Sequence, residues 1–245
     1  MSGHSKWNNI KRRKGAQDAA KGKIFTKLGR EIQLAVKQGG PDPATNRTLE
    51  DVIAKAKANN MPNDTINRSI KKASGSDAEE YEEIIYEGYG EAGVAVMVRC
   101  LSDNRNRTAG EVRHLFGKYN GNLGENGCVS FMFENVGYMI LDRERYSDED
   151  TVMMEAIEAG ADDVIAQEDY FELLCSPSDY HEVHHAMQDM GYEFMDSGLE
   201  YRPLNYVQVP DEAVRASVEN LLEALDDFDD VTDVFHNMED SDEED

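Results

Sequence analysis

Apolar residues recur at helical spacing in the first part of the chain. Between about residues 18 and 38 they fall on one helix face, at Phe25, Leu28, Ile32, Ala35 and Val36. The pair Gly39-Gly40 is typical of a helix end. A second helix is predicted after Pro43, capped by Thr45 or Asn46, and a third from Pro62 to about Ala73. Three short helices joined by tight turns predict a small bundle.

The pattern changes to strands after an acidic linker at residues 77–83. Residues 84–87 and 94–101 are predicted strands, and residues 128–134 form a third after a turn rich in Gly and Asn. Between them, Thr108 and Glu111 have the spacing of a capping box, which predicts a helix to about Tyr119.

A strand–helix–strand–strand–helix–strand order follows, which is that of a ferredoxin-like domain. The predicted strands are residues 136–141, 163–167, 170–175 and 192–201, and Ser147 and Ser178 cap the two helices. Beyond Pro203 the pattern predicts a strand at 206–209, a helix at 211–225 and a strand at 231–235. These pieces are too few for a domain, so we expect them to complete the sheet begun at residues 84–134.

The expected fold class is therefore α+β with three domains. Residues 1–78 form a basic N-terminal arm and a three-helix bundle, and residues 79–134 with 204–238 form a discontinuous α/β sheet domain. Residues 135–203 form a ferredoxin-like domain inserted into the second, and residues 239–245 form an acidic tail expected to be disordered.

Charge is distributed unevenly along these domains. The chain has 50 acidic and 25 basic side chains, and a net charge of -25 would repel nucleic acid. Residues 1–75, however, contain 16 Lys and Arg against 6 Asp and Glu, whereas the rest of the chain contains 9 against 44. This pattern indicates an acidic protein with a basic N-terminal part that binds phosphate groups. The alternative interpretation is an acidic globular protein in which the basic helix pair has no binding role.

The basic N-terminal part supplies the candidate nucleic-acid contacts. In the arm these are His4, Lys6, Lys11, Arg12, Arg13 and Lys14, and in the first helix Lys23, Lys27 and Arg30, which we expect on the solvent face. Trp7 either stacks on a base or anchors the arm to the bundle. Arg105 and Arg107, in the segment 103–108 before a helix, either bind a phosphate or belong to a turn.

Two motifs typical of enzymes are present in unsuitable contexts. Residues 88–93 match G-x-G-x-x-G, but a strand follows where a dinucleotide site needs a helix, so we expect a turn between two strands. His181, Glu182 and His185 match H-E-x-x-H, yet the apolar residues of that helix place both histidines on its outer face. We expect no catalytic residue, no metal and no cofactor.

The remaining features concern location. The chain has three widely spaced cysteines, which do not suggest a disulfide framework. The first residues are polar. The longest apolar run is Val94–Val98, whereas a membrane helix needs about 20 apolar residues. We expect a cytoplasmic protein without a membrane partner.

Several segments together resemble the YebC/PmpR family. They are Gly3–Trp7, Ile10–Lys11, Ala16–Asp18, Gly22–Leu28, Ala58–Met61, Tyr86–Gly90, Asp103–Thr108, Glu111–Arg113 and Gly121–Gly124. The sequence departs from the family pattern at Glu91-Ala92, where Pro-Gly is expected, and in its long acidic tail.

The resemblance implies the same three-domain fold and a regulator of gene expression. Family members are described as transcriptional regulators that bind promoter DNA. Others are ribosome-associated translation factors, and the mitochondrial translational activator of cytochrome c oxidase is similar. The hypothesis is a non-enzymatic, nucleic-acid-binding regulator whose partner is promoter DNA or ribosomal RNA, with the ribosome as a further partner and no small-molecule substrate. The alternatives are a zinc hydrolase using His181, Glu182 and His185, or an acidic protein-interaction module.

Overall fold

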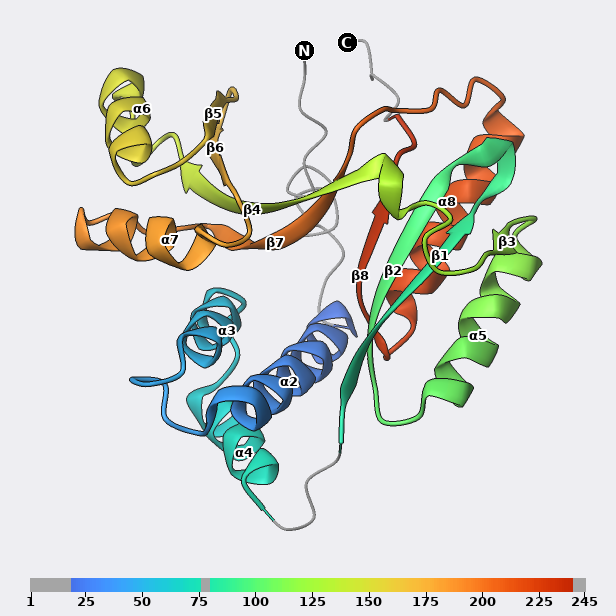
Figure 1. Cartoon of the computed structure of the whole chain (residues 1–245), viewed down its shortest axis with the longest axis horizontal. Coiled ribbons are helices and arrows are strands. Elements are labelled where there is room, and N and C mark those ends of the chain that lie inside the picture. Colours follow the sequence, from blue (N-terminus) through green and yellow to red (C-terminus); the bar gives the residue numbers. More distant parts are fainter. Residues whose placement is uncertain (1–18, 76–79, 240–245) are drawn as a thin grey trace. The chain divides into compact units, whose positions relative to one another are not determined.

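The computed structural model describes residues 19–75 and 80–239 (Figure 1). The arm, with His4, Lys6, Trp7, Lys11, Arg12, Arg13 and Lys14, and the end of the acidic tail lie outside these residues. The described residues form two compact units. One contains Asn135–Arg202 and is called the inserted unit below. The other, called the main unit, contains the described residues before and after it.

The main unit begins with the predicted helical bundle. Its helices are α2 (Ala19–Gly39), α3 (Arg47–Ala58) and α4 (Asn63–Ala73). Asn46 caps α3, because its side chain accepts a hydrogen bond from the backbone N–H of Leu49. The core of the bundle is made of Leu28, Ile32, Ala35, Val36, Leu49, Ala56, Met61 and Ile66.

The main unit also contains an antiparallel sheet covered on one face by two helices. Its strands are β1 (Glu82–Tyr89), β2 (Ala95–Ser102), β3 (Asn122–Leu123) and β8 (Val231–His236), in the order β3-β1-β2-β8. The helices α5 (Arg105–Lys118) and α8 (Glu212–Asp227) pack against each other and against the side chains of Val94, just before β2, and of Val96, Val98 and Cys100 in β2. β8 follows α8 and pairs with β2, so the end of α8 lies near the end of this sheet (Figure 1).

The inserted unit has ferredoxin-like topology. Its elements are β4 (Phe133–Asp142), α6 (Glu149–Glu158), β5 (Asp163–Ala166), β6 (Tyr170–Cys175), α7 (Tyr180–Asp189) and β7 (Asp196–Pro203). The sheet order β5-β6-β4-β7 is the one expected for this fold. Both helices pack on the same sheet face, through Val152 and Ala156 of α6 and Val183 and Met187 of α7. The fold class predicted from the sequence is confirmed.

Several local predictions were wrong. The N-cap residues of α6 and α7 are Asp148 and Asp179, each one residue after the predicted Ser147 and Ser178. The helix α5 begins at Arg105 with Asn104 as its cap, one turn before the predicted capping box, because the Thr108 hydroxyl is buried and used elsewhere. Residues 128–132 are not a strand, since residues 130–132 form a 3-10 turn and β4 begins at 133. The predicted strand at 206–209 is reduced to a single bridge between Val207 and Met238.

Candidate nucleic-acid interface on the basic face of α2

The basic face of α2 is occupied by carboxylates from the end of α8. Lys23 Nζ lies 2.8 Å from an Asp227 carboxylate oxygen, and half-exposed side chains form this pair. Lys27 Nζ donates to the Asp226 carbonyl oxygen at 2.7 Å and lies 3.4 Å from its carboxylate. The hydrogen bond to Asp227 raises the pKa of Lys23 above its ordinary value. The cations predicted to follow a phosphate backbone therefore already have anionic partners.

Arg30 continues this arrangement one turn further along α2. Its Nη1 lies 2.9 Å from the Asp230 carboxylate and also donates to the Asp229 carbonyl oxygen. The Lys27 and Arg30 side chains are only 13% and 16% exposed, so the expectation that they lie on an open solvent face was wrong. The reason is a contact across about 200 residues of sequence, which no local pattern reveals.

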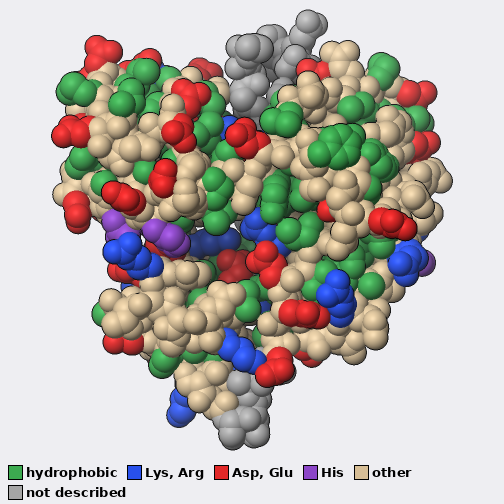
Figure 2. All heavy atoms as spheres, in the orientation of Figure 1, with side chains coloured by type: hydrophobic (Ala, Val, Ile, Leu, Met, Phe, Trp, Pro, Cys, Tyr) green, Lys and Arg blue, Asp and Glu red, His purple; other side chains and the backbone are tan. Residues whose placement is uncertain are grey.

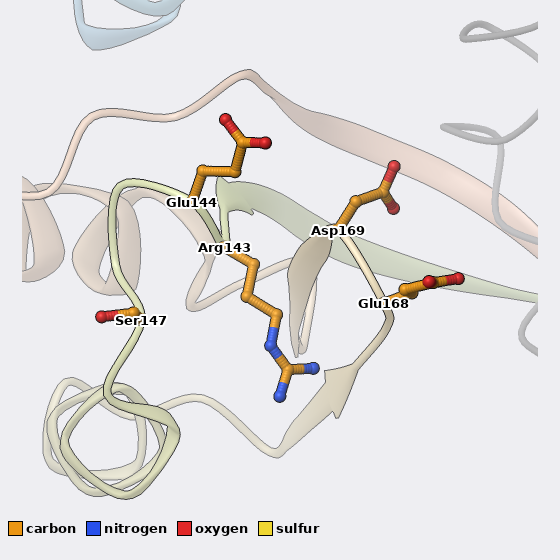
Figure 3. A pocket seen from close by; sticks show the side chains of 5 residues that line it. All are labelled: Arg143, Glu144, Ser147, Glu168 and Asp169. Atoms are coloured by element: carbon orange, nitrogen blue, oxygen red, sulfur yellow. The ribbon is translucent and has the colours of Figure 1, made fainter.

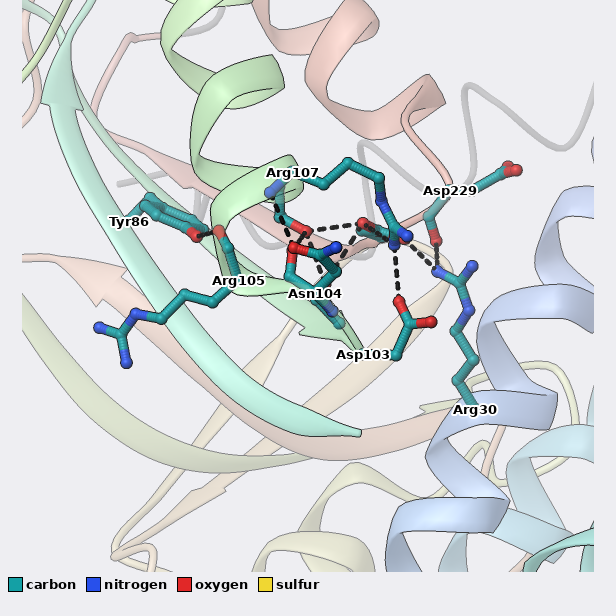
Figure 4. A network of polar contacts seen from close by, with 10 residues as sticks. Arg30, Tyr86, Asp103, Asn104, Arg105, Arg107 and Asp229 are labelled. Atoms are coloured by element: carbon teal, nitrogen blue, oxygen red, sulfur yellow. Dashed lines mark hydrogen bonds and ion pairs between the residues drawn. The ribbon is translucent and has the colours of Figure 1, made fainter. Parts of the chain in front are cut away.

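Asp230 is the centre of a polar network that joins the bundle to the sheet (Figure 4). This carboxylate is 3% exposed and accepts hydrogen bonds from the Thr108 hydroxyl at 2.7 Å and from Arg107 Nη2 at 2.9 Å, besides the contact with Arg30. Burial by itself would raise the pKa of Asp230. The hydrogen bonds from Thr108 and Arg107, with the charges of both arginines, outweigh it and lower the pKa.

The segment 103–108 is held by turn chemistry and by this network. The Asn104 side chain accepts from the backbone N–H of Arg107 at 3.1 Å, and Asp103 lies 2.8 Å from the Arg107 guanidinium. Arg107 therefore has two carboxylate partners. The exposed Arg105 side chain points away from the network in Figure 4. Of the two predicted arginines, Arg105 is the one left open to an external anion.

The segment 86–90 also has a structural role. The buried Glu87 carboxylate accepts hydrogen bonds from the backbone N–H groups of Gly127, Val129 and Ser130 at 2.8 to 2.9 Å. Although burial opposes ionisation, these donors lower the pKa of Glu87. A Cβ atom at Gly88 would lie 2.6 Å from the Asn122 carbonyl oxygen. Only glycine therefore fits at this position, where β1 pairs with β3. These residues fix the loop after β3.

Further cations of the bundle are open to solvent. They are Arg47, Lys57, Arg68 and Lys71, on α3 and α4, and all four are exposed. Within the part of the chain that the structure describes, none of the four forms an ion pair with a carboxylate. The bundle thus keeps positive charge that no carboxylate of the described residues neutralises.

The inserted unit has the opposite character. Residues 135–202 contain 18 Asp and Glu but only three arginines and no lysine. Each arginine is bound within the unit: Arg143 lies 2.6 Å from Glu149, Arg145 pairs with Glu193, and Arg202 pairs with Glu172 and Glu200. On the face drawn in Figure 2, acidic side chains are spread over the region of α6 and β5. A phosphate backbone is repelled by such a surface.

One arginine for two buried carboxylates leaves a charge imbalance in that unit. Glu172 and Glu200 are 0% and 2% exposed, and both contact Arg202. Burial, together with the nearby Glu200, raises the pKa of Glu172 to about 7 despite the opposing effect of Arg202.

A shallow hollow in the inserted unit is also acidic (Figure 3). It is lined by Arg143, Glu144, Ser147, Glu168 and Asp169. The Arg143 side chain is already engaged by Glu149 and by the Gln167 carbonyl oxygen. The remaining carboxylates give the hollow a negative charge, so it has the chemistry to receive a cationic side chain.

Neither of the two enzyme-like motifs forms a cofactor or metal site within the described residues. Gly88 and Tyr89 end β1, and residues 90–94 form the turn to the antiparallel strand β2, as predicted for a turn between two strands. On α7 the most buried histidine is His184, whose pKa is lowered to about 4 by burial and by the neighbouring His185 and His181. In residues 19–75 and 80–239, no three His, Cys, Asp or Glu side chains are placed to hold a metal ion, and no helix has the length and apolar character to cross a membrane.

The structure thus defines an α+β protein with a helical bundle and two antiparallel sheets, in which uncompensated positive charge lies on the bundle and not on the inserted unit. The TACO1/YebC N-terminal domain model matches residues 5–76, and the model of the second and third TACO1/YebC domains matches residues 81–238. The chain belongs to the TACO1/YebC family.

Relatives of similar length carry a common description. Proteins named probable transcriptional regulatory protein from Acetivibrio thermocellus and Ruminiclostridium cellulolyticum are 53% and 52% identical to this chain. The alignments cover 97% and 99% of this chain and 98% of each relative. The crystal structure of a conserved hypothetical protein from Aquifex aeolicus is 43% identical, with a TM-score of 0.82 over 91% of both chains.

Sequence reasoning missed the acidic residues that complete the site. Asp226, Asp227, Asp229 and Asp230 follow one another at the carboxyl end of α8. The helix macrodipole disfavours negative charge at that end. Four aspartates at this unfavourable position indicate that cationic side chains lie nearby. This sequence signal could have predicted the contact with α2.

Proposed function

We propose that the protein is a non-enzymatic regulator of gene expression that binds nucleic acid through its bundle and basic arm. The observation that carries the proposal is the separation of charge between the two units. The bundle keeps exposed cations on α3 and α4, whereas every arginine of the inserted unit is bound internally. The relatives named as probable transcriptional regulatory proteins support a regulatory role.

The ion pairs on α2 differ in how readily a phosphate can replace the carboxylate. In the Lys23–Asp227 pair the side chains are 44% and 62% exposed, and exposed pairs contribute about 0 to 1 kcal/mol to stability. A phosphate oxygen can therefore take the place of Asp227 on Lys23. It can next take the place of the Asp226 carboxylate, which is 34% exposed and lies 3.4 Å from Lys27 Nζ. Arg30 and Arg107 remain on Asp230, because breaking a buried pair costs about 3 to 5 kcal/mol.

The proposed contact surface therefore has three parts. Lys23 and Lys27 contact phosphates after exchange, and Arg105 and the exposed cations of α3 and α4 contact them directly. The arm, with His4, Lys6, Lys11, Arg12, Arg13 and Lys14, adds further phosphate contacts, and Trp7 stacks on a base.

Structured RNA, such as ribosomal RNA, fits this surface better than promoter DNA. RNA helices are recognised mainly through shape and backbone contacts, which a dispersed set of cations provides. Sequence-specific reading of DNA requires amide or guanidinium groups aligned along one element that enters the major groove. The exposed cations Arg47, Lys57, Arg68 and Lys71 are instead divided between two short helices, and Lys23 lies on a third.

Two double variants with opposite expected effects test the proposal. Lys23→Ala/Lys27→Ala removes two phosphate contacts, so the affinity falls and the slope of log K against log salt decreases by about 2. Asp226→Asn/Asp227→Asn removes the competing carboxylates, so the affinity rises severalfold. Fluorescence anisotropy with a labelled RNA hairpin and a DNA duplex of the same length, between low and moderate salt, measures both effects and ranks the two ligands.

A matched control separates local competition from net charge. Glu219→Gln/Glu223→Gln also removes two charges from α8, but neither residue forms a hydrogen bond or ion pair with α2 in the described residues. The proposal fails if this control increases the affinity as much as Asp226→Asn/Asp227→Asn, or if Lys23→Ala/Lys27→Ala binds as tightly as the wild type.

A further inference from the structure

The outer face of α6 exposes three large apolar side chains. Met153, Met154 and Ile157 are 36%, 65% and 62% exposed, and their spacing places them next to one another within about one helical turn. Single exposed apolar residues are common and need no explanation. Three adjacent exposed apolar side chains on a short helix form a patch, and such a patch on a protein surface marks a contact surface.

Acidic residues surround this patch. Asp150 and the C-terminal Glu158 lie on the same exposed face of α6, which contains no Lys or Arg. The hollow lined by Glu144, Glu168 and Asp169 adjoins the start of this helix, because Arg143 at its edge is bound to Glu149 of the first turn (Figure 3). In Figure 2, hydrophobic and acidic side chains lie side by side over α6.

We propose that this face of α6 binds a partner protein through a segment that combines apolar anchors with Lys and Arg. The apolar anchors cover Met153, Met154 and Ile157, and the cations pair with Asp150, Glu158 and the carboxylates of the hollow. Methionine side chains are flexible and polarisable, so they adapt to anchors of different shape. A basic amphipathic helix laid along α6 has both features at the required spacing.

The charge of the patch excludes the other classes of occupant. Nucleic acid and anionic membranes present negative charge, which the carboxylates around the patch repel. A second copy of the inserted unit brings the same acidic surface, so self-association through this face places like charges together. The partner is therefore a cationic protein segment. This inference does not depend on the proposed nucleic-acid site, which lies on the main unit.

The test uses the full chain and a helical peptide of Leu and Lys about 14 residues long, near the shortest length at which an isolated helix holds. The same peptide with Glu in place of Lys is the control ligand. Methyl NMR of the methionines reports the contact. The signals of Met153 and Met154 are expected to shift with the Lys peptide only, and that of the buried Met139 to stay in place.

Variants that keep the charge decide whether the patch is the site. Met154→Ser/Ile157→Ser is expected to weaken binding of the Lys peptide about tenfold, because two anchors are lost. Phe131→Ser/Leu204→Ser removes two apolar side chains that are 67% and 57% exposed on the main unit, and leaves binding unchanged. Asp150→Asn/Glu158→Gln weakens binding and reduces its salt dependence.

Three results overturn the proposal. The first is equal affinity of the wild type and Met154→Ser/Ile157→Ser, which means that the peptide is held by net charge alone. The second is the absence of a shift at Met153 and Met154. The third is a dimer in sedimentation that Met154→Ser/Ile157→Ser abolishes, since the face is then covered by a second copy of the chain.

Discussion

Asp230 shows how one residue can hold two structural elements of the main unit in place. Its carboxylate receives Arg30 from α2 and Arg107 and Thr108 from α5. The Ser102 hydroxyl lies 2.6 Å from the Thr108 hydroxyl and extends the network to the end of β2. Buried polar groups of this kind are stable only when every member has a partner. The network therefore acts as a unit, and we expect the loss of Asp230 to affect all of it.

Replacement of Asp230 by Asn should lower the free energy of unfolding by about 3 kcal/mol at neutral pH, because two guanidinium groups lose their buried anion. The lowered pKa of Asp230 means that its contribution is present above about pH 4 and is lost as the pH falls through the folded-state value. The difference between variant and wild type should therefore shrink at pH 3, as measured by urea unfolding at both pH values.

Asp103, the more exposed carboxylate partner of Arg107, provides the control for this prediction. Asp103 is half exposed and also contacts Arg107, so Asp103→Asn should cost less than about 1 kcal/mol. An equal cost for the two variants would mean that the burial of Asp230 has no energetic importance.

At the scale of the elements, the connection between α2 and α3 depends on Asn46. Its amide donates to the carbonyl oxygens of Ala35 and Gly40, both at 2.8 Å, while its oxygen caps α3 at Leu49. One side chain thus satisfies groups at the end of one helix and the beginning of the next. A Cβ atom at Gly39 would lie 2.6 Å from the Asn46 side chain, so the glycine leaves room for this contact.

We expect Asn46→Ala to destabilise the bundle by about 2 kcal/mol, because a cap is lost and two carbonyl oxygens, one buried and one partly buried, lose their donor. Asn46→Asp restores the cap but not the donor and should recover only part of the loss. Thermal unfolding of both variants measures the effect. Equal stability of Asn46→Ala and the wild type would show that water replaces all three hydrogen bonds.

The elements were predictable where their signals are local. The apolar spacing and the glycine or proline boundaries of α2, α3 and α4 are contained in short segments, and so is the strand and helix order of the inserted unit. The start of α5 was misplaced because Thr108 has the sequence of a cap but is used by a distant carboxylate. The two-residue strand β3 was missed, since pairing with β1 and not its composition makes it a strand.

The candidate site was less predictable than the fold for the same reason. Sequence pattern placed Lys23, Lys27 and Arg30 on one face of α2, and the structure does so as well. Their carboxylate partners follow about 200 residues later, and helical periodicity contains no information about contacts at that distance. The nucleic-acid contacts of the arm and of α2 remain predictions.

At the scale of the whole molecule, the two units are chemically suited to different partners. The main unit keeps exposed cations on its bundle, and the inserted unit keeps acidic side chains around an apolar patch. The two proposals therefore assign a polyanion to one unit and a cationic protein segment to the other.

We therefore expect the two proposed surfaces to act independently. Met154→Ser/Ile157→Ser should leave RNA affinity unchanged, and Asp226→Asn/Asp227→Asn should leave binding of the Lys peptide unchanged, because substitutions without shared partners are usually additive. Anisotropy and methyl NMR on the same four proteins, including the combined variant, measure this. A change of more than about threefold in either cross-measurement would indicate coupling between the surfaces.

The placement of the aspartates at the end of α8 also has a consequence for biosynthesis. The bundle leaves the ribosome first, and the residues that neutralise Lys23, Lys27 and Arg30 are translated about 200 positions later. At about 5 to 20 residues per second, the nascent chain shows an uncovered cationic helix for roughly 10 to 40 s. The proposed function therefore predicts that the unfinished chain binds RNA more tightly than the complete one, and that a product truncated before Asp226 keeps this higher affinity.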